Sequence, residues 1–315
     1  NSISSNDLIL TAGPSISQRE MIYSSDAAIN GWNTKWSKYI TKFENEFANY
    51  IGVKYAISTS SCTGAMHIAL MSLGIKSGDE VIVPDITWVS TANAVRLVGA
   101  VPIFADVDIN TWTLDPVSVE KLITNKTKAI MPVHLYGHPC EMDKIKKISI
   151  KYKIPIIEDA AQAIGTKYKN KFVGTFGEVG CFSAHPLKNL NAIGDAGYLV
   201  TNNNKLAKKA KLLRNHGIEK RNKVLTFGYV SRMDNLQASV LNIRLKKIKK
   251  IIKTRRSNAK LYFTLLQNLK KVILPIDNKF DFNTYHTFVI QAEKRNELKS
   301  YLEKKGISTA IHYPI

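Results

Sequence analysis

The chain has 315 residues, of which 44% are hydrophobic and 9% aromatic, a composition typical of a soluble globular protein with one large and one smaller domain. No apolar run reaches the ~18 residues of a membrane-spanning helix, and the first residues lack the pattern of a signal peptide, so we expect no membrane partner. The net charge of +20 favours either a nucleic-acid partner or a lysine-rich solvated surface that attracts small anions.

Short apolar runs alternate with helix-length amphipathic segments between residues 55 and 201. The predicted strands are residues 56–58, 80–83, 101–104, 129–133, 154–157, 180–183 and 198–200. The predicted helices between them are residues 63–73, 89–98, 116–123 and 141–152. This order predicts an α/β fold with a mostly parallel seven-stranded sheet that is covered on both faces. Polar residues at the carboxyl ends of these strands mark the expected ligand site: Ser61, Asp85, Asp106, His134, Asp159 and Ser183.

The pattern changes after residue 203 to long helices at 205–215 and 235–269. A strand at 287–290, a helix at 295–305 and a strand at 309–312 then predict a small α+β domain. We expect a large domain over residues 1–240, with 1–35 packed on it, and a small domain over 241–315.

The densest basic run, residues 244–256, lies in the second long helix. Apolar residues recur at helical spacing along it and bury one face: Leu241, Leu245, Ile248 and Ile252. The lysines fall mainly on the other faces, and no zinc-finger, RNP-like or helix-turn-helix signature accompanies them. We therefore expect a solvated basic surface and no nucleic-acid partner.

The three cysteines indicate a reducing compartment. Cys62, Cys140 and Cys181 are far apart and lack any C-x-x-C spacing, so we expect neither a disulfide framework nor a bound metal. His134 and His138 lie near Cys140, but no second ligand cluster accompanies them. We expect a cytoplasmic protein.

The segments 156–162 and 181–190 carry the strongest chemical signal. The first delivers Asp159 at the end of a buried-looking strand, followed by Gln162; the second contains Ser183 and Lys188. A lysine whose pKa is lowered by burial can attack an aldehyde, and a carboxylate can pair with a protonated pyridine nitrogen. Taken alone, Lys188 is one basic residue among 45 and Asp159 is more often a helix cap. Together they predict a Schiff-base site for pyridoxal phosphate.

Two further segments suit the same ligand. Residues 58–65 join a strand to a helix, and the free amides there can bind a phosphate beside Thr63 and Gly64. Trp88 follows the next strand and can stack on a planar ring, although an aromatic residue at such a place is more often part of the core.

Read jointly, the motifs resemble those of the DegT/DnrJ/EryC1/StrS family of pyridoxal-phosphate sugar aminotransferases. The similarity extends from about residue 13 to residue 314, and the order and spacing of its motifs are specific. The motifs are Ser61-Cys-Thr-Gly-Ala-Met-His-Ile-Ala-Leu, Gly78-Asp-Glu-Val-Ile-Val-Pro, Pro132-Val-His-Leu-Tyr-Gly-His-Pro, Glu158-Asp-Ala-Ala-Gln-Ala, Phe182-Ser-Ala-His-Pro-Leu-Lys-Asn-Leu and Gly194-Asp-Ala-Gly.

The resemblance implies a type I aspartate-aminotransferase fold and assigns roles to single residues. Lys188 corresponds to the Schiff-base lysine and Asp159 to the partner of the pyridine nitrogen. The other implied cofactor contacts are Gln162 at the ring hydroxyl, Trp88 on the ring face, and Thr63, Gly64 and Ser183 at the phosphate. His312 and Tyr313 are candidate contacts to substrate or partner subunit, as is Arg232.

The chain departs from the family pattern at three places. Cys62 replaces a glycine beside the phosphate hydroxyls, and Val230 replaces an asparagine that reaches the partner subunit's cofactor phosphate. The family segment that begins with His312-Tyr-Pro continues further than this sequence does, so we expect an incomplete small domain.

The implied function is a homodimeric aminotransferase that converts a keto sugar, nucleotide-linked, into an amino sugar for a surface polysaccharide such as lipopolysaccharide. Glutamate is the expected amino donor, with pyridoxamine phosphate as the half-reaction form of the cofactor. Two alternatives within the fold are an aminotransferase for a free keto-sugar acid and a sugar dehydratase, although dehydratases carry histidine in place of Lys188. A third alternative is a non-catalytic basic binding or regulatory protein.

Overall fold

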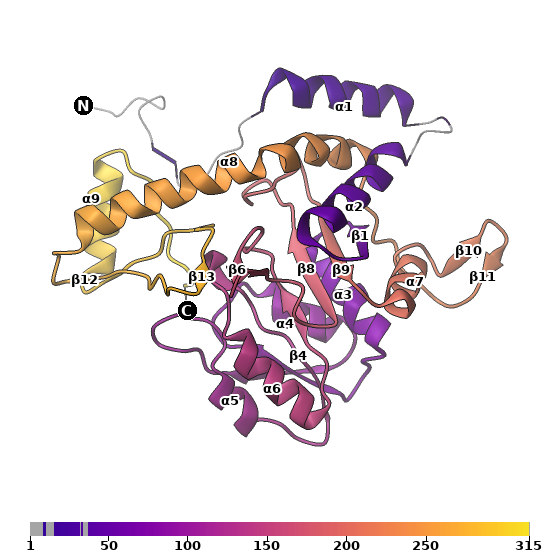
Figure 1. Cartoon of the computed structure of the whole chain (residues 1–315), viewed down its shortest axis with the longest axis horizontal. Coiled ribbons are helices and arrows are strands. Elements are labelled where there is room, and N and C mark those ends of the chain that lie inside the picture. Colours follow the sequence, from indigo (N-terminus) through magenta and orange to yellow (C-terminus); the bar gives the residue numbers. More distant parts are fainter. Residues whose placement is uncertain (1–8, 11–15, 32, 34–36, 315) are drawn as a thin grey trace.

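The computed structural model describes residues 9–10, 16–31, 33 and 37–314, and its centre is a seven-stranded sheet (Figure 1). Its strands are β1 (Tyr55–Thr59), β2 (Glu80–Pro84), β3 (Val101–Ala105), β4 (Thr127–Ile130), β5 (Ile157–Asp159), β8 (Val179–Ser183) and β9 (Gly197–Thr201). The pairing gives the orders β3-β2-β4 and β5-β8-β9-β1, joined by parallel bridges from Ile130 to Ile156 and from Val133 to Asp159. Only β9 runs against its neighbours, so the predicted mostly parallel sheet is confirmed.

Most of the sheet is buried on both faces, and alternate residues of its inner strands enter different cores. In β9, Tyr198 and Val200 join one hydrophobic cluster, whereas Leu199 joins another. Helix α2 (Lys38–Ile51) covers the first face, with Phe47 edge-on to Tyr198 at 4.4 Å between ring centroids. The other face is covered by α3 (Cys62–Leu73), α4 (Ser90–Leu97) and α7 (Asn204–Leu213). The edge strand β3 differs, because its Val101 and Phe104 are exposed.

Helices α5 (Pro116–Lys121) and α6 (Met142–Tyr152) pack together beside the half of the sheet that contains β4. Each predicted helix of the large domain overlaps an observed one. Asp115 caps α5 by accepting hydrogen bonds from the Val117 and Ser118 amides, and Pro116 occupies the first turn. A short 3-10 turn, Leu135–Gly137, follows the end of β4.

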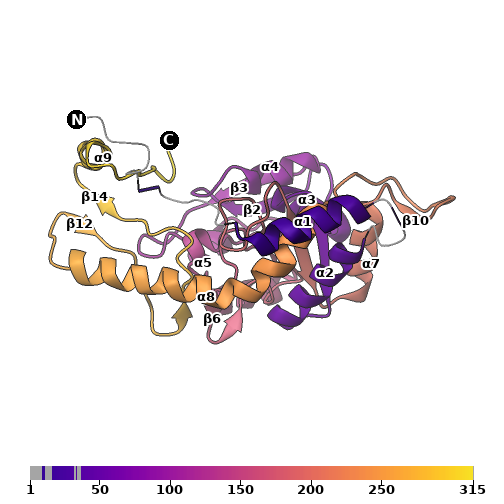
Figure 2. The ribbon, with the colours of Figure 1, turned by 90° about the horizontal axis from the view of Figure 1, so that it is seen from above.

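The long helix α8 (Asn235–Leu266) connects the large domain to the small one (Figures 1 and 2). The predicted apolar face is confirmed, because Leu241, Leu245, Ile248 and Ile252 are all buried. Helix α1 (Gln18–Asn30) lies along α8, where its buried Glu20 accepts a hydrogen bond from Lys247. Residues 1–35 were expected to pack on the large domain. The structure describes α1 from this segment, while residues 1–8, 11–15, 32 and 34–35 lie outside the described part.

The small domain consists of α9 (Arg295–Lys304) and short strand pairs. Strand β12 (Val272–Ile273) pairs with β14 (Gln291–Ala292), and β13 (Asp281–Phe282) pairs with β6 (Lys167–Tyr168), which forms a hairpin with β7 (Lys171–Phe172). A second hairpin, β10 (Ile218–Lys220) with β11 (Lys223–Val224), extends from the large domain. Residue 240, the predicted domain boundary, lies within α8.

The predicted strands at 287–290 and 309–312 are wrong. Neither segment forms a strand, although β14 begins directly after residue 290. Phe288 instead packs against Tyr262 and Phe263 of α8, with ring centroids 4.9 and 5.2 Å away. An apolar run that packs through its side chains against a helix needs no strand partner.

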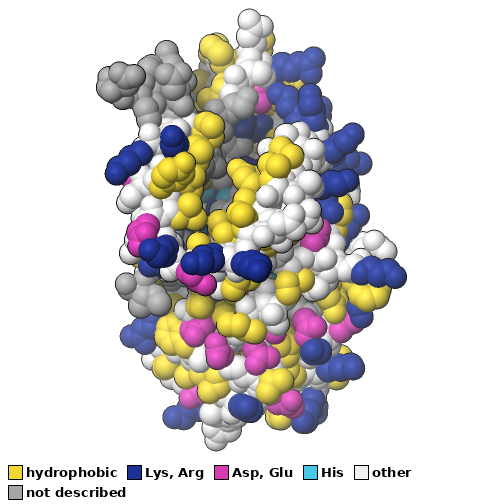
Figure 3. All heavy atoms as spheres, turned by 90° about the vertical axis from the view of Figure 1, so that its left-hand side faces the viewer, with side chains coloured by type: hydrophobic (Ala, Val, Ile, Leu, Met, Phe, Trp, Pro, Cys, Tyr) yellow, Lys and Arg dark blue, Asp and Glu magenta, His cyan; other side chains and the backbone are white. Residues whose placement is uncertain are grey.

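The surface distributes its charge widely. Figure 3, which views the small-domain side, shows Lys and Arg side chains spread along the edges of the face, with acidic side chains among them in its lower half. Some arginines of the basic run have structural partners, because Arg255 donates to the carbonyls of Tyr285 and His286 and Arg256 to that of Asn283. Within the described residues, none of the helices is apolar enough over a sufficient length to span a bilayer.

Candidate active site

The carboxyl ends of adjacent strands bring the predicted site residues together. Asp159 is the last residue of β5 and lies opposite Cys181 of the parallel strand β8. Ser183 ends β8 and lies opposite Gly197 of β9, which in turn lies opposite Thr59 at the end of β1. The carboxyl edge of the sheet therefore holds the acid, the hydroxyl and the start of α3 side by side.

Asp159 is a buried carboxyl with an incomplete set of partners. It is 3% exposed and accepts hydrogen bonds from the Thr91 hydroxyl (2.8 Å) and the Ala161 amide (3.0 Å). Burial raises the pKa of Asp159, while these donors and Lys188 act in the opposite direction. A buried carboxylate of this kind is satisfied by a cationic partner such as a protonated pyridine nitrogen.

Lys188 lies on the loop that follows β8, where its amide donates to the His185 carbonyl (2.8 Å). Burial lowers the pKa of the Lys188 amine, and Cys62 and Asp159 oppose this shift through their charges. The lower pKa increases the fraction of unprotonated amine at neutral pH, which is the nucleophilic form. Lys188 and Asp159 influence each other electrostatically, which supports their expected placement near one another.

The start of α3 forms an anion-binding turn. Ser61 caps the helix by accepting from the Gly64 amide (3.0 Å), and the amides of the first turn have no carbonyl partner within the helix. Gly197 packs directly against the main chain of Ser61 and Cys62, and a Cβ at this position would overlap it. Gly197 also lies opposite Ser183 in the sheet, so this close packing links the end of β8 to the start of α3, where the phosphate site is expected.

Gln162 is held at both ends of its side-chain amide. Its Oε1 accepts from the Tyr136 amide (2.8 Å), and its Nε2 donates to the Tyr313 hydroxyl (2.7 Å). The Tyr313 ring stacks on that of Tyr136 and lies 6.1 Å from the ring of Trp88, measured between centroids. Trp88 is 60% exposed, which leaves its indole accessible to a planar ligand.

The C-terminal candidates reach the site within the same chain. The Tyr136 hydroxyl donates to the His312 carbonyl (2.9 Å). Burial lowers the pKa of His312, and the charge of Lys188 adds to this shift. Arg232, by contrast, lies on the surface and donates to the Asn215 side chain (3.2 Å). Within the described residues, His312 and Tyr313 therefore lie next to the other site residues, whereas Arg232 does not.

Sequence reasoning missed two residues of the site and undervalued a third. Thr91 of α4 holds Asp159, and Tyr136 holds Gln162; no local pattern marks either residue. The sequence placed His134 among the polar residues at strand ends but gave it no partner; its ring contacts the buried Glu158 beside Asp159 (3.0 Å). Among the described residues, no cluster of His, Cys, Asp and Glu could hold a metal.

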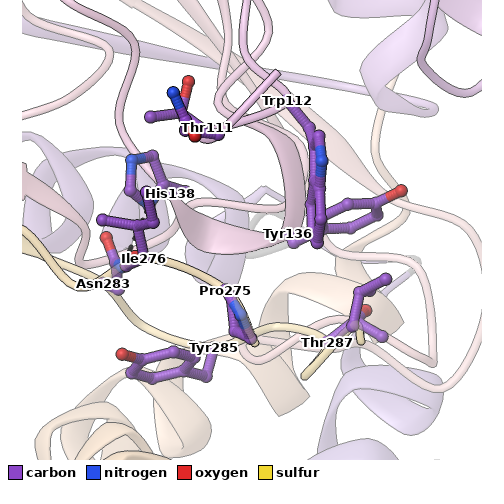
Figure 4. A pocket seen from close by; sticks show the side chains of 11 residues that line it. Thr111, Trp112, Tyr136, His138, Pro275, Ile276, Asn283, Tyr285 and Thr287 are labelled. Carbon is purple, nitrogen blue, oxygen red and sulfur yellow. Dashed lines mark hydrogen bonds between the residues drawn. The ribbon is translucent and has the colours of Figure 1, made fainter. Parts of the chain in front are cut away.

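A separate pocket lies on the far side of Tyr136 (Figure 4). Its walls come from the loop at Thr111 and Trp112 and from the small-domain segment that contains Pro275 and Tyr285. The close-up shows His138 and Asn283 next to each other, and the Asn283 amide nitrogen lies 3.0 Å from His138 Nδ1. The pocket lies between the segment at residues 111–112 and the segment at residues 275–289. It adjoins the site through Tyr136, which contacts Gln162.

Comparison with known proteins identifies the family. Residues 14–315 match the model of the DegT/DnrJ/EryC1/StrS aminotransferase family. The chain belongs to this family. It is therefore a pyridoxal-phosphate-dependent aminotransferase of the type I fold, as the motifs predicted.

Three relatives illustrate the range of the family. A dTDP-3-amino-3,4,6-trideoxy-alpha-D-glucose transaminase from Streptomyces venezuelae is 40% identical over 87% of this chain and 72% of its own. A pleiotropic regulatory protein from Geobacillus stearothermophilus is 39% identical over 88% of this chain and 75% of its own. The crystal structure of NtdA from Bacillus subtilis, with bound pyridoxamine phosphate, superposes with a TM-score of 0.86 at 34% identity, over 95% of this chain and 70% of its own.

Proposed function

We propose that this aminotransferase moves an amino group from glutamate to the keto carbon of a nucleotide-linked sugar. The observation that carries the proposal is the burial of Lys188 and Asp159 together at the carboxyl edge of the sheet, next to a helix start that can bind phosphate. The similarity to a transaminase named for a dTDP-linked amino sugar supports the substrate class.

The residues present fit pyridoxal phosphate. Asp159 would hold the ring nitrogen, Gln162 the ring hydroxyl and Trp88 the ring face, while Thr63, Gly64 and Ser183 would hold the phosphate. When bound, the cofactor supplies an aldehyde that carries the amino group and a ring that withdraws electrons from the reacting carbon. Lys188 would hold the cofactor covalently through its Nζ.

Lys188 has a second task once substrate has released it. Its Nζ would carry a proton between the reacting carbon of the substrate and that of the cofactor. Burial favours this transfer because it keeps part of the amine unprotonated. Asp159 would stay anionic and keep the adjacent ring nitrogen protonated, so that the ring can withdraw the negative charge that develops on the reacting carbon. His312 and Tyr313, next to Gln162 and Trp88, are the proposed contacts for the sugar.

We further propose a homodimer with shared sites, in which residues 227–233 and Arg232 reach the partner subunit. This loop exposes Phe227 (98%) and Val230 (61%), and apolar side chains with such exposure favour a protein contact. The proposed setting is the cytoplasm, where the amino sugar would be made for a surface polysaccharide. The proposed domain division remains residues 1–240 and 241–315.

The function can be tested on the purified chain loaded with pyridoxal phosphate. We expect a visible absorbance band that borohydride removes by reducing the bond to Lys188, and loss of that band on adding glutamate. Mass spectrometry of keto sugars incubated with glutamate then identifies the product. A protein that binds no cofactor, or that binds it without reacting with any amino donor, would instead match a regulatory role of the kind named for the Geobacillus relative. Amination of a free keto-sugar acid would correct the substrate class alone.

A further inference from the structure

Two consecutive acids end β5, but only one of them has a role in the reaction described above. Side chains alternate along a strand, so Asp159 and Glu158 lie on opposite faces of the sheet. Asp159 contacts Thr91 on the cofactor side. Glu158 is also fully buried, and a carboxylate at such a place requires a physical explanation because its desolvation is costly.

The Glu158 carboxylate accepts four hydrogen bonds. Its Oε1 accepts from the amides of Phe176 (2.6 Å) and Gly177 (2.7 Å), and its Oε2 accepts from the amide of Gly174 (2.6 Å) and the ring of His134 (3.0 Å). Charge-assisted bonds of this length compensate for lost water. The carboxylate thereby fastens the turn at residues 174–177 to the end of β5.

The His134 ring completes the network. Its Nδ1 accepts from the Cys140 amide (3.1 Å), so the ring proton is assigned to Nε2, which donates to Glu158. The His134 main chain donates to the Asp159 carbonyl (3.0 Å), and the Asp159 amide donates to the Pro132 carbonyl (2.9 Å). The segment that holds the Glu158 side chain therefore also holds the Asp159 main chain.

We propose that Glu158 and His134 are positioning residues for Asp159. Their buried contact locks the end of β5 between residues 132–134 and 174–177, and so holds the Asp159 carboxylate where the ring nitrogen of the cofactor would lie. The inference rests on the proposed role of Asp159. Neither residue touches the reacting atoms, and the effect is one of orientation, on which catalytic groups depend strongly.

Glu178 provides a control next to the same strand. Its Oε2 accepts from the Ile156 amide (2.6 Å), and its own amide donates to the Ile156 carbonyl (3.0 Å). It therefore holds the residue before β5 with a carboxylate, three residues before Asp159, although Glu178 is exposed and Glu158 is buried. If the network acts only through stability, the change at the cofactor in each variant should follow that variant's loss of thermal stability.

The experiment compares Glu158→Gln, His134→Leu, His134→Gln and Glu178→Gln. In Glu158→Gln, one carboxylate oxygen becomes an NH2 group that faces hydrogen-bond donors, so two of the four bonds are lost. His134→Gln keeps a hydrogen-bond donor toward Glu158. His134→Leu removes that donor. At a temperature where every variant is folded, we expect Glu158→Gln and His134→Leu to alter the visible circular dichroism of bound pyridoxal phosphate and to slow the glutamate half-reaction about tenfold. His134→Gln should regain most of this loss. Glu178→Gln should lower thermal stability and leave both readouts unchanged.

Wild-type dichroism and rate in Glu158→Gln would overturn the proposal, as would an equal change in Glu178→Gln. Hydrogen exchange on the cofactor-free protein separates this inference from the proposed function. Exchange of the Asp159 amide that is faster than in wild type for Glu158→Gln, but not for Glu178→Gln, supports positioning even if wild type binds no cofactor. The same exchange rate in both variants refutes the proposal. Should Glu158→Gln fail to fold, the two His134 variants decide the question by the same readouts.

Discussion

At the scale of single residues, the chemistry depends on how far the protein shifts two titratable groups. Burial lowers the pKa of Lys188 and raises that of Asp159, so each is more often neutral than in water. In the proposed site, a cationic ring nitrogen would favour the anionic form of Asp159, whereas the amine of Lys188 would stay easier to deprotonate than in water.

Replacement of Lys188 tests the covalent role. We expect Lys188→Ala to abolish both the borohydride-sensitive absorbance and turnover, because the substitution removes the amine that would bond to the aldehyde. The variant should stay folded and bind pyridoxal phosphate reversibly, as dialysis can show. Partial rescue by an added small amine would support the proton-transfer role, while retained turnover without amine would refute the assignment.

Asp159→Asn removes the anion and keeps the shape of the side chain. The amide cannot stabilise a protonated ring nitrogen, so the glutamate half-reaction should slow about a hundredfold, equivalent to ~3 kcal/mol in the barrier. Thr91 can still bond to the new side chain, which should preserve the melting temperature within a few degrees. Near-normal rates would show that Asp159 only caps the turn at Ala161.

At the scale of secondary-structure elements, α1 is attached to α8 through one buried acid as well as through the apolar packing of Tyr23 and Ala27. Burial raises the pKa of Glu20, but hydrogen bonds from Ser17 and Lys247 outweigh this and lower it from 4.5 to about 2. Because the folded pKa lies below the unfolded one, the contribution to stability is present above pH 4.5 and is lost as the pH falls toward 2.

Glu20→Gln tests this attachment. We expect the free energy of unfolding at pH 7 to fall by about 1–2 kcal/mol, since the ion pair with Lys247 is partly screened by solvent. The difference from wild type should disappear near pH 2, which denaturant titrations at several pH values can measure. Glu46→Gln is the control, because its exposed pair with Lys42 should contribute less than about 0.5 kcal/mol. Equal losses in both variants would contradict the buried attachment.

At the scale of the whole molecule, the proposed dimer concerns the residues that one chain leaves outside its own site. Lys188, Asp159, Gln162 and Tyr313 meet within it, but Arg232 and residues 227–230 face outward on the surface. This arrangement favours a dimer in which each chain adds a loop to its partner.

Phe227→Asp tests the dimer. The Phe227 side chain is 98% exposed, so a charge there should not disturb the folded chain but should oppose burial in an interface. We expect sedimentation to show a shift from dimer to monomer together with weaker cofactor binding. Phe280→Asp, at a side chain that is 63% exposed in the small domain, should change neither. A wild-type monomer with full activity would refute shared sites.

Much of the fold could be predicted from the sequence because its signals are local. The apolar run at residues 198–200 predicts a strand and the helical spacing from Leu241 to Ile252 predicts a buried helix face, and both are confirmed. The order of short strands and helices also placed Asp159 and Ser183 at one edge, since parallel strands end together. The pairing of Lys188 with Asp159 predicts a Schiff-base site, and the family motifs add the implied role of Gln162.

Only the tertiary structure decided which partners complete the site. Thr91 reaches Asp159 across 68 residues of sequence, and Tyr313 reaches Gln162 across 151. Glu158 adjoins Asp159 in the sequence, yet three of its donors are amides of the turn at residues 174–177 and the fourth is the ring of His134. The apolar run at 287–290 likewise packs on α8 instead of joining a sheet. Such contacts depend on the relative placement of whole elements, and no local pattern of residue types encodes that placement.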